Sequence, residues 1–201
     1  MITRRGNIIF LEDVINKAVD LAREKIAEKN PDLADRDETA LMIGVGAVLY
    51  SQFSVRRQKD VNFDWDEVLS FEGETGPYLQ YTHAHLCSLL RNYPAEVSAE
   101  FDQSLLDKEE ERRVVELLAD FPAAVEDAAR SYDPNVIAAH LIRLAGAFNR
   151  VYQRKDDKGR IDKIISDDAN LSAARIALVE SVRTVIYEGL SLLGIQAPQE
   201  M

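Results

Sequence analysis

Residues 61–91 read VNFDWDEVLSFEGETGPYLQYTHAHLCSLLR, and this stretch decides the fold. Its first half places the only tryptophan of the chain, Trp65, among three acidic residues. Its second half predicts a helix that begins at Pro77 with Thr75 as the N-cap, because proline suits the first helical turn. The stretch therefore predicts an acidic turn, anchored by a buried aromatic side chain, that leads into a helix ending near residue 92.

Outside this stretch, apolar residues recur at helical spacing along most of the chain. They predict helices over about 11–29, 38–53, 105–119 and 123–129, one helix that starts at 133–134, and a last one that ends at 193–194. No segment alternates apolar and polar residues for long enough to predict a strand. The predicted fold class is all-α.

The composition is typical of a globular protein, with 201 residues and 46% hydrophobic side chains. The single cysteine, Cys87, can form no disulfide within the chain and fits a reducing compartment. The longest apolar run, 40–50, is too short to cross a bilayer, and no signal peptide is evident. We therefore predict a cytoplasmic protein without membrane contact.

The net charge of -11 is unusual for a protein that binds nucleic acid. The charge is unevenly distributed, since residues 141–201 carry 9 Lys/Arg and 8 Asp/Glu. A phosphate backbone could use this local basic patch, although charge alone favours a solvated helix face and loop. By the same argument the acidic run 109–111, followed by two arginines, predicts a solvated helix surface with i,i+4 pairs. The patch has seven members: Arg143, Arg150, Arg154, Lys155, Lys158, Arg160 and Lys163.

Taken whole, 61–91 resembles the part of arginyl-tRNA synthetases that leads from the catalytic side into the anticodon-binding domain. The family pattern is close to FDWDxxLSFEGxTxPYLQYAHAR. Residues 144–152, LAGAFNRVY, resemble its late LAxxFNxxY helix, and 175–201 resemble its closing segment, which ends in methionine. Residues 1–6, MITRRG, resemble the second signature loop of class I synthetases in its degenerate Met-Ser-Thr-Arg-Lys-Gly form. We therefore expect the C-terminal part of such an enzyme, ending at the natural C-terminus of the family.

The resemblance implies a helical bundle of the class I synthetase anticodon-binding type with an N-terminal helical stem. It divides the chain into a signature-loop remnant with a helical connecting segment, 1–70, and a helical anticodon-binding domain, 71–201.

The resemblance also implies which residues would contact tRNA, where unpaired bases stack on aromatic side chains. Tyr78 and Tyr81 are three residues apart and so share a helix face. Without the family, two core tyrosines with satisfied hydroxyl groups would be the simpler interpretation. His85 stands where the family usually has arginine, which would weaken the contact made there. The implied tRNA-binding residues are Tyr78, Tyr81, Arg150, Tyr152, Arg154 and Met201.

The signature-loop remnant, with Thr3, Arg4 and Arg5, would hold the triphosphate of ATP in a complete enzyme. It departs from the pattern, because the lysine that should precede Met1 is missing and Ile2 replaces serine. A frayed terminus is the alternative interpretation. The 201 residues contain no His-x-Gly-His signature and no nucleotide-binding sheet. We therefore expect this chain alone to be catalytically inactive and to bind no cofactor, with ATP belonging to the complete family enzyme.

Three functions remain open at this point. The chain is a module that binds the tRNA for arginine, the trans-acting half of a split arginine-tRNA ligase that docks onto a separately encoded catalytic half, or a truncated paralogue that serves as a structural or regulatory partner. The first is favoured by the long matched segment, the matched C-terminal segment and the basic last third of the chain, and the presence of the tyrosines argues against the third.

Two other motifs resemble binding sites but predict none. Gly44 and Gly46 suggest a dinucleotide fingerprint, yet no third glycine and no strand accompany them, so close helix packing is expected. His83, His85 and Cys87 suggest a metal site, but His85 points away from the other two on a helix. We predict no metal.

Overall fold

The computed structural model describes residues 10–60, 64–156 and 158–201. Within these ranges every regular element is a helix, apart from one antiparallel bridge between Lys155 and Ile161. The all-α prediction is therefore confirmed. The elements are α1 (Leu11–Lys29), α2 (Arg36–Phe53), α3 (Trp65–Val68), α4 (Gly76–Arg91), the 3-10 turn η2 (Gln103–Leu105), α5 (Glu109–Ser131), α6 (Asn135–Gln153) and α7 (Ala169–Leu192).

The start of α4 and the end of α7 follow the local sequence signals. The Thr75 hydroxyl accepts a hydrogen bond from the Tyr78 backbone N–H at 3.1 Å, as predicted for the N-cap. At the end of α7, Gly194 has φ +71°, a left-handed conformation that ends a helix at low cost in glycine. The Ile195 N–H then bonds the Leu190 carbonyl at 2.9 Å.

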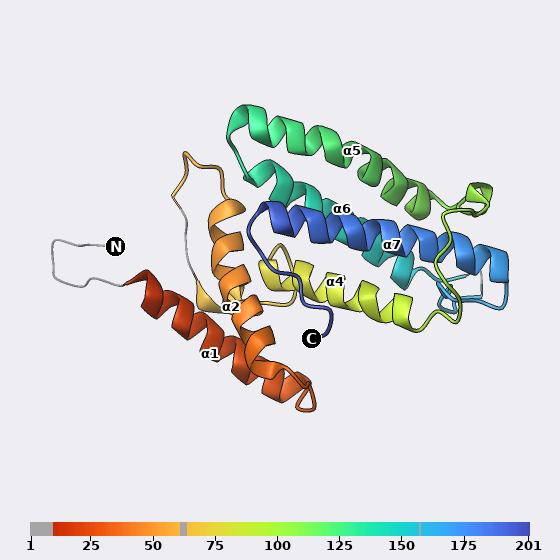
Figure 1. Cartoon of the computed structure of the whole chain (residues 1–201). Coiled ribbons are helices and arrows are strands. Elements are labelled where there is room, and N and C mark those ends of the chain that lie inside the picture. The colour runs from red at the N-terminus through yellow and green to blue at the C-terminus, as the bar shows by residue number, and fades with distance from the viewer. Residues whose placement is uncertain (1–9, 61–63, 157) are drawn as a thin grey trace.

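The helices form a pair and a bundle (Figure 1). Helices α1 and α2 pack against each other at one end of the molecule, and α4 to α7 lie side by side in the rest. Helix α2 also contacts α4, which joins the pair to the bundle. Among the described residues, no helix is long and apolar enough to cross a membrane.

Glycines of α2 and α4 allow close helix contacts, and this confirms the packing role predicted for Gly44 and Gly46. A Cβ at Gly46 would lie 2.7 Å from the Gln80 side-chain nitrogen of α4. A Cβ at Gly44 would lie 2.6 Å from the Val19 backbone nitrogen of α1. A Cβ at Gly76, the first residue of α4, would lie 2.8 Å from the Gly46 carbonyl oxygen. The Gly44–Gly46 motif therefore serves the contacts of α2 with α1 and α4.

The pair and the bundle have separate hydrophobic cores. The bundle core is built mainly from α4, α5, α6 and α7, with Phe148 of α6 among its largest buried side chains, and Tyr50 of α2 joins it. The smaller core lies between α1 and α2 around Ile26 and Ile43. Trp65 packs beside α2 against a small cluster of Ala47, Val68 and Leu69, but it is half-buried rather than buried as the sequence predicts.

The C-terminal tail, residues 195–201, runs back along α4 to the helix pair (Figure 1). The side-chain amide of Gln80 donates to the carbonyls of Met42 at 2.9 Å and Gln196 at 2.8 Å, so it binds α2 and the tail together. Nδ1 of His83 lies 2.9 Å from the Pro198 carbonyl oxygen. These buried contacts fix the tail against both parts of the fold.

One helix prediction is wrong. The sequence predicts two helices around Pro122, but α5 is a single helix over Glu109–Ser131 with this proline inside it. Proline in a helix interior costs about 3 kcal/mol. The buried face of α5, with Val114 and Leu117 before the proline and Ala124 after it, packs onto α6 and keeps the helix continuous.

Candidate nucleic-acid interface

An open groove of about 620 Å³ lies between α4, α6 and the loop that precedes α4. Three of its residues, Tyr78, Tyr81 and His85, are spaced i, i+3 and i+7 and therefore share one face of α4. Tyr152 reaches the same groove from the last turn of α6. The structure thus brings together three tyrosines that are predicted to contact tRNA.

The rings of Tyr81, His85 and Tyr152 form an aromatic cluster in this groove. The Tyr81 and His85 rings are nearly parallel, with centroids 6.4 Å apart. The Tyr152 ring meets the His85 ring edge to face at a centroid distance of 4.5 Å. Tyr81 is 50% exposed and Tyr152 is 38% exposed, so both tyrosines keep much of their surface open to a ligand. Neither is a core tyrosine.

His85 lies at the centre of the cluster, although the sequence indicated only a departure from the family pattern and a metal motif that was set aside. Its Nε2 atom is enclosed and has no hydrogen-bond partner among the described residues. Burial lowers the pKa of His85, so the ring is neutral near pH 7. The groove floor is therefore an uncharged heteroaromatic ring where the family pattern has a cation.

Tyr78 sits deeper in the groove than Tyr81 and is half-buried. Burial raises the pKa of its hydroxyl, while a hydrogen bond with Thr82 and the positive charge of Arg150 act in the opposite direction. Arg150 is exposed on α6. An exposed guanidinium beside an aromatic groove is suited to hold a phosphate.

A second groove, of about 540 Å³, runs between α1 and the groove described above. Tyr81 lines both grooves, and Met201 lines the second. The Met201 carbonyl accepts a hydrogen bond from the Asn30 side chain at 3.1 Å, which fixes the end of the tail beside α1. Tyr81 and Met201 therefore border one continuous surface, with Lys25 and Lys29 on its far wall.

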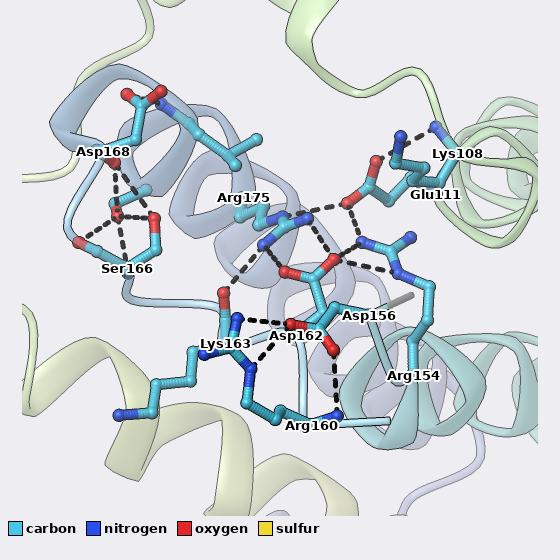
Figure 2. Close-up of polar contacts among 12 residues, drawn as sticks. Lys108, Glu111, Arg154, Asp156, Arg160, Asp162, Lys163, Ser166, Asp168 and Arg175 are labelled. Atoms are coloured by element: carbon cyan, nitrogen blue, oxygen red, sulfur yellow. Dashed lines mark hydrogen bonds and ion pairs between the residues drawn. The ribbon is translucent and has the colours of Figure 1, made fainter. Parts of the chain in front are cut away.

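Arg154 takes no part in this surface, because it belongs to a cluster of buried ion pairs (Figure 2). Its Nη2 atom lies 2.9 Å from Oε1 of Glu111 and 2.7 Å from Oδ2 of Asp162. Its side chain is only 10% exposed. This location argues against the predicted phosphate contact of Arg154.

The same cluster corrects the interpretation of the acidic run on α5. Glu111 is fully buried rather than solvated, and its Oε1 also accepts from Nε of Arg175 at 3.0 Å. Arg175 pairs with Asp162 at 2.8 Å, and this contact holds the pKa of that carboxyl below its usual value. Helix spacing could not reveal these pairs, since the partners of Glu111 lie 43 and 64 residues away.

The remaining candidates add no further site. Thr3, Arg4 and Arg5 lie outside the described residues. His83 contacts the tail, as described above, and Cys87 is buried beside it. Among the residues that the structure describes, no group of three His, Cys, Asp or Glu side chains could hold a metal ion.

Comparison with known proteins identifies the bundle. Residues 79–201 match the model of the DALR anticodon binding domain. The chain belongs to this family. Residues 1–65 match a second model, which is described as the catalytic domain of tRNA synthetases class I (R).

Curated relatives and a solved structure agree with this membership. The chain is 42% identical over 201 residues to an arginine–tRNA ligase of Halothermothrix orenii and 48% identical over 199 residues to that of Enterococcus faecalis. It spans 34% of the length of each of these relatives. The arginyl-tRNA synthetase of Thermus thermophilus superposes with a TM-score of 0.90 at 36% identity, over 96% of this chain and 32% of that one. The resemblance to the C-terminal part of arginyl-tRNA synthetases is thereby confirmed.

A more distant structure shows the fold alone. The arginyl-tRNA synthetase of Plasmodium falciparum superposes with a TM-score of 0.83 at 18% identity, over 96% of this chain and 34% of that one. The helical arrangement thus matches at low sequence identity.

Proposed function

We propose that this DALR domain chain binds the tRNA for arginine through unpaired bases of the anticodon loop. The observation that carries the proposal is the aromatic cluster of Tyr81, His85 and Tyr152 in an open groove, in which both tyrosines are exposed. Bases splayed from an RNA loop are commonly held by stacking on such rings and by hydrogen bonds to their edges. The ring of His85 is neutral, so it can stack on a base and does not attract an acidic side chain that would compete with the base.

The other residues of the surface take supporting roles in this proposal. Tyr78 closes the inner end of the groove, and exposed Arg150 holds a phosphate of the loop. Met201 offers an apolar contact to a base that enters the second groove. We assign these roles to the anticodon-binding part, 71–201, and treat 1–70 as the segment that connects it to the catalytic side.

The proposal is tested by removing one ring of the cluster. Tyr81→Ala should weaken binding of an arginine tRNA transcript about tenfold, because stacking of one base on an aromatic ring contributes about 1–3 kcal/mol. Fluorescence anisotropy of labelled transcript measures the dissociation constant. Tyr187→Ala is a matched control, since Tyr187 is 46% exposed on α7, outside both grooves. Equal affinities of the two variants would contradict the proposal.

A second candidate function is favoured by the match of residues 1–65 to the catalytic-domain model. In it, the chain contributes to arginine–tRNA ligation when joined to an upstream catalytic half, encoded with it or separately, in the cytoplasm. ATP and arginine would then bind the upstream half, and no chemical step is assigned to the described residues. Leu41, 50% exposed on α2, is available for such a contact.

This second function has its own test. The chain is mixed with a separately expressed catalytic half of an arginyl-tRNA synthetase, and charging of arginine tRNA is followed. Restored charging that falls with Leu41→Asp, while tRNA binding by the chain is unchanged, would support it. No charging with a catalytic half that retains arginine activation would contradict it.

A further inference from the structure

Tyr152 lines a third cavity in addition to the 620 Å³ groove, which we call the main groove. This third cavity has a volume of about 200 Å³, and we call it the bridge pocket because it lies at the Lys155–Ile161 bridge. Its volume is below the roughly 300–1,000 Å³ of most small-molecule sites, so it suits a single flat ring rather than a whole cofactor. It is lined by Leu89, Tyr152, Ile161, Lys163, Ile164 and Ile165.

The segment that carries Ile161 is held firmly in place. The Asp162 N–H donates to the Arg154 carbonyl at 2.9 Å, and the Arg175 guanidinium donates to the Lys163 carbonyl at 2.7 Å. Ile161 is nevertheless 63% exposed. A branched apolar side chain fixed at the surface in this way, next to an aromatic ring, offers a preformed contact for a ligand.

The charges around the bridge pocket favour an anion. Asp156 is paired with Arg160 at 2.8 Å, and Asp162 is turned into the buried ion cluster (Figure 2). Lys163, by contrast, extends away from that cluster (Figure 2) and forms no ion pair with any described residue. Asp156 and Asp162 are thus paired with arginines, while the Lys163 ammonium at the edge of the pocket pairs with no carboxylate among the described residues.

We propose that the bridge pocket binds a second unpaired nucleobase of the same RNA, next along the strand to the base stacked in the main groove. Ile161 and the ring of Tyr152 contact the base, and Lys163 holds its phosphate. Two observations select this occupant: Tyr152 lines both the pocket and the main groove, and Lys163 is the one charged residue among the described residues that line the pocket. The inference rests on the proposed tRNA binding.

The test is a double-mutant cycle that combines a protein substitution with the removal of one RNA base and compares the dissociation constants. The full chain and its Ile161→Ala variant are titrated by anisotropy with the anticodon stem-loop of arginine tRNA, and with stem-loops that lack the base at one loop position each. Ile161→Ala should raise the dissociation constant about tenfold for the intact loop. At one abasic position the variant and the parent chain should bind equally, because the contact is already lost.

Lys163 provides a second, independent readout. Lys163→Gln should weaken binding and lower the dependence of log affinity on log salt by about one unit, as expected for one lost phosphate contact. Lys59→Gln is the control, because Lys59 is an exposed lysine that lines neither this pocket nor the two grooves, and its salt dependence should match the parent chain. Circular dichroism confirms that the variants are folded.

The outcomes separate this inference from the proposed function. If the parent chain does not bind the stem-loop, both fail. If it binds and Tyr81→Ala weakens binding, but Ile161→Ala and Lys163→Gln have no effect, only the bridge pocket is contradicted. An effect of Ile161→Ala that is equal at every abasic position would also contradict it.

Discussion

At the residue scale, the buried ion cluster positions the groove without touching it. Arg154 follows Tyr152 by two residues. Its ion pairs with Glu111 and Asp162 hold the end of α6 against α5 and against the segment that carries Ile161. Breaking a buried ion pair by removal of one partner is costly, because the remaining charges stay buried. The position of Tyr152 therefore depends on carboxylates that face away from the groove.

Glu111→Gln should lower the free energy of unfolding by about 3 kcal/mol, because Arg154 and Arg175 then lose the fully buried carboxylate that pairs with both of them. Urea denaturation followed by circular dichroism measures the change. Glu110→Gln serves as the control, since Glu110 is 37% exposed and lies 3.5 Å from Arg154. We expect it to cost less than about 1 kcal/mol. An equal decrease in the free energy of unfolding in both variants would contradict a special contribution of the buried Glu111 carboxylate to stability.

Tyr81 and the buried ion cluster show what a sequence can and cannot predict about a site. The position of Tyr81 beside Tyr78 was predictable, because their spacing places both on one face of a helix, and both line the groove. Glu111 and Arg154 were not, because each looks like a surface charge on its own helix. Their roles depend on a meeting of α5, α6 and α7 that helical periodicity does not encode.

At the element scale, close helix contacts decide where the groove forms. Helix α2 lies against both α1 and α4, and its glycines remove the side chains that would hold these helices apart. The first turn of α4 thereby sits against α2, and its later turns carry Tyr81 and His85 to the groove. The helix pair and the binding surface are mechanically linked through this contact.

Two helical glycines should respond in opposite directions to alanine. Gly44→Ala should destabilise the fold by about 1–3 kcal/mol, because the new Cβ would meet the Val19 backbone at 2.6 Å. Gly146→Ala should stabilise it by about 0.5–1 kcal/mol, because nothing lies within 4 Å and alanine favours a helix. Thermal unfolding compares the two. A stabilising Gly44→Ala would contradict the close approach of α1 and α2.

Most elements were predictable from local signals, and the failure at α5 has a physical reason. Thr75 and Gly194 mark helix ends through hydrogen bonding and backbone conformation that depend only on near neighbours. Pro122 is equally local, yet it does not end its helix, because burial of the α5 face against α6 outweighs the lost backbone bond. Tertiary packing outweighs the low helix propensity of proline where the buried apolar face of a helix continues on both sides of it.

At the scale of the whole molecule, stability should depend on pH through the three histidines. Burial lowers the pKa of His83, His85 and His140, so all three are neutral in the folded chain near pH 7. The unfolded chain binds protons near pH 6.5 and therefore takes up more protons below that value than the folded chain. The free energy of unfolding should fall as the pH falls from 7.5 to 5.5.

Each histidine contributes up to about 1.4 kcal/mol per pH unit to this slope. Urea denaturation at pH 7.5, 6.5 and 5.5 measures it, and His140→Gln should make the slope shallower. The carboxyl of Asp162 acts at lower pH, because its lowered pKa stabilises the fold above its ordinary range and this stabilisation is lost only as the pH falls through the lowered value. A free energy that is constant from pH 7.5 to 5.5 would contradict neutral buried histidines.

The most direct measurement of the central claim is the affinity of the unmodified chain for an arginine tRNA transcript. Its comparison is the same transcript with the anticodon bases replaced, each at two salt concentrations. We predict binding that weakens as salt rises, as phosphate contacts require, and that weakens further when the anticodon bases are replaced. Absence of binding at low salt, or equal affinity for both transcripts, would contradict anticodon recognition by this chain.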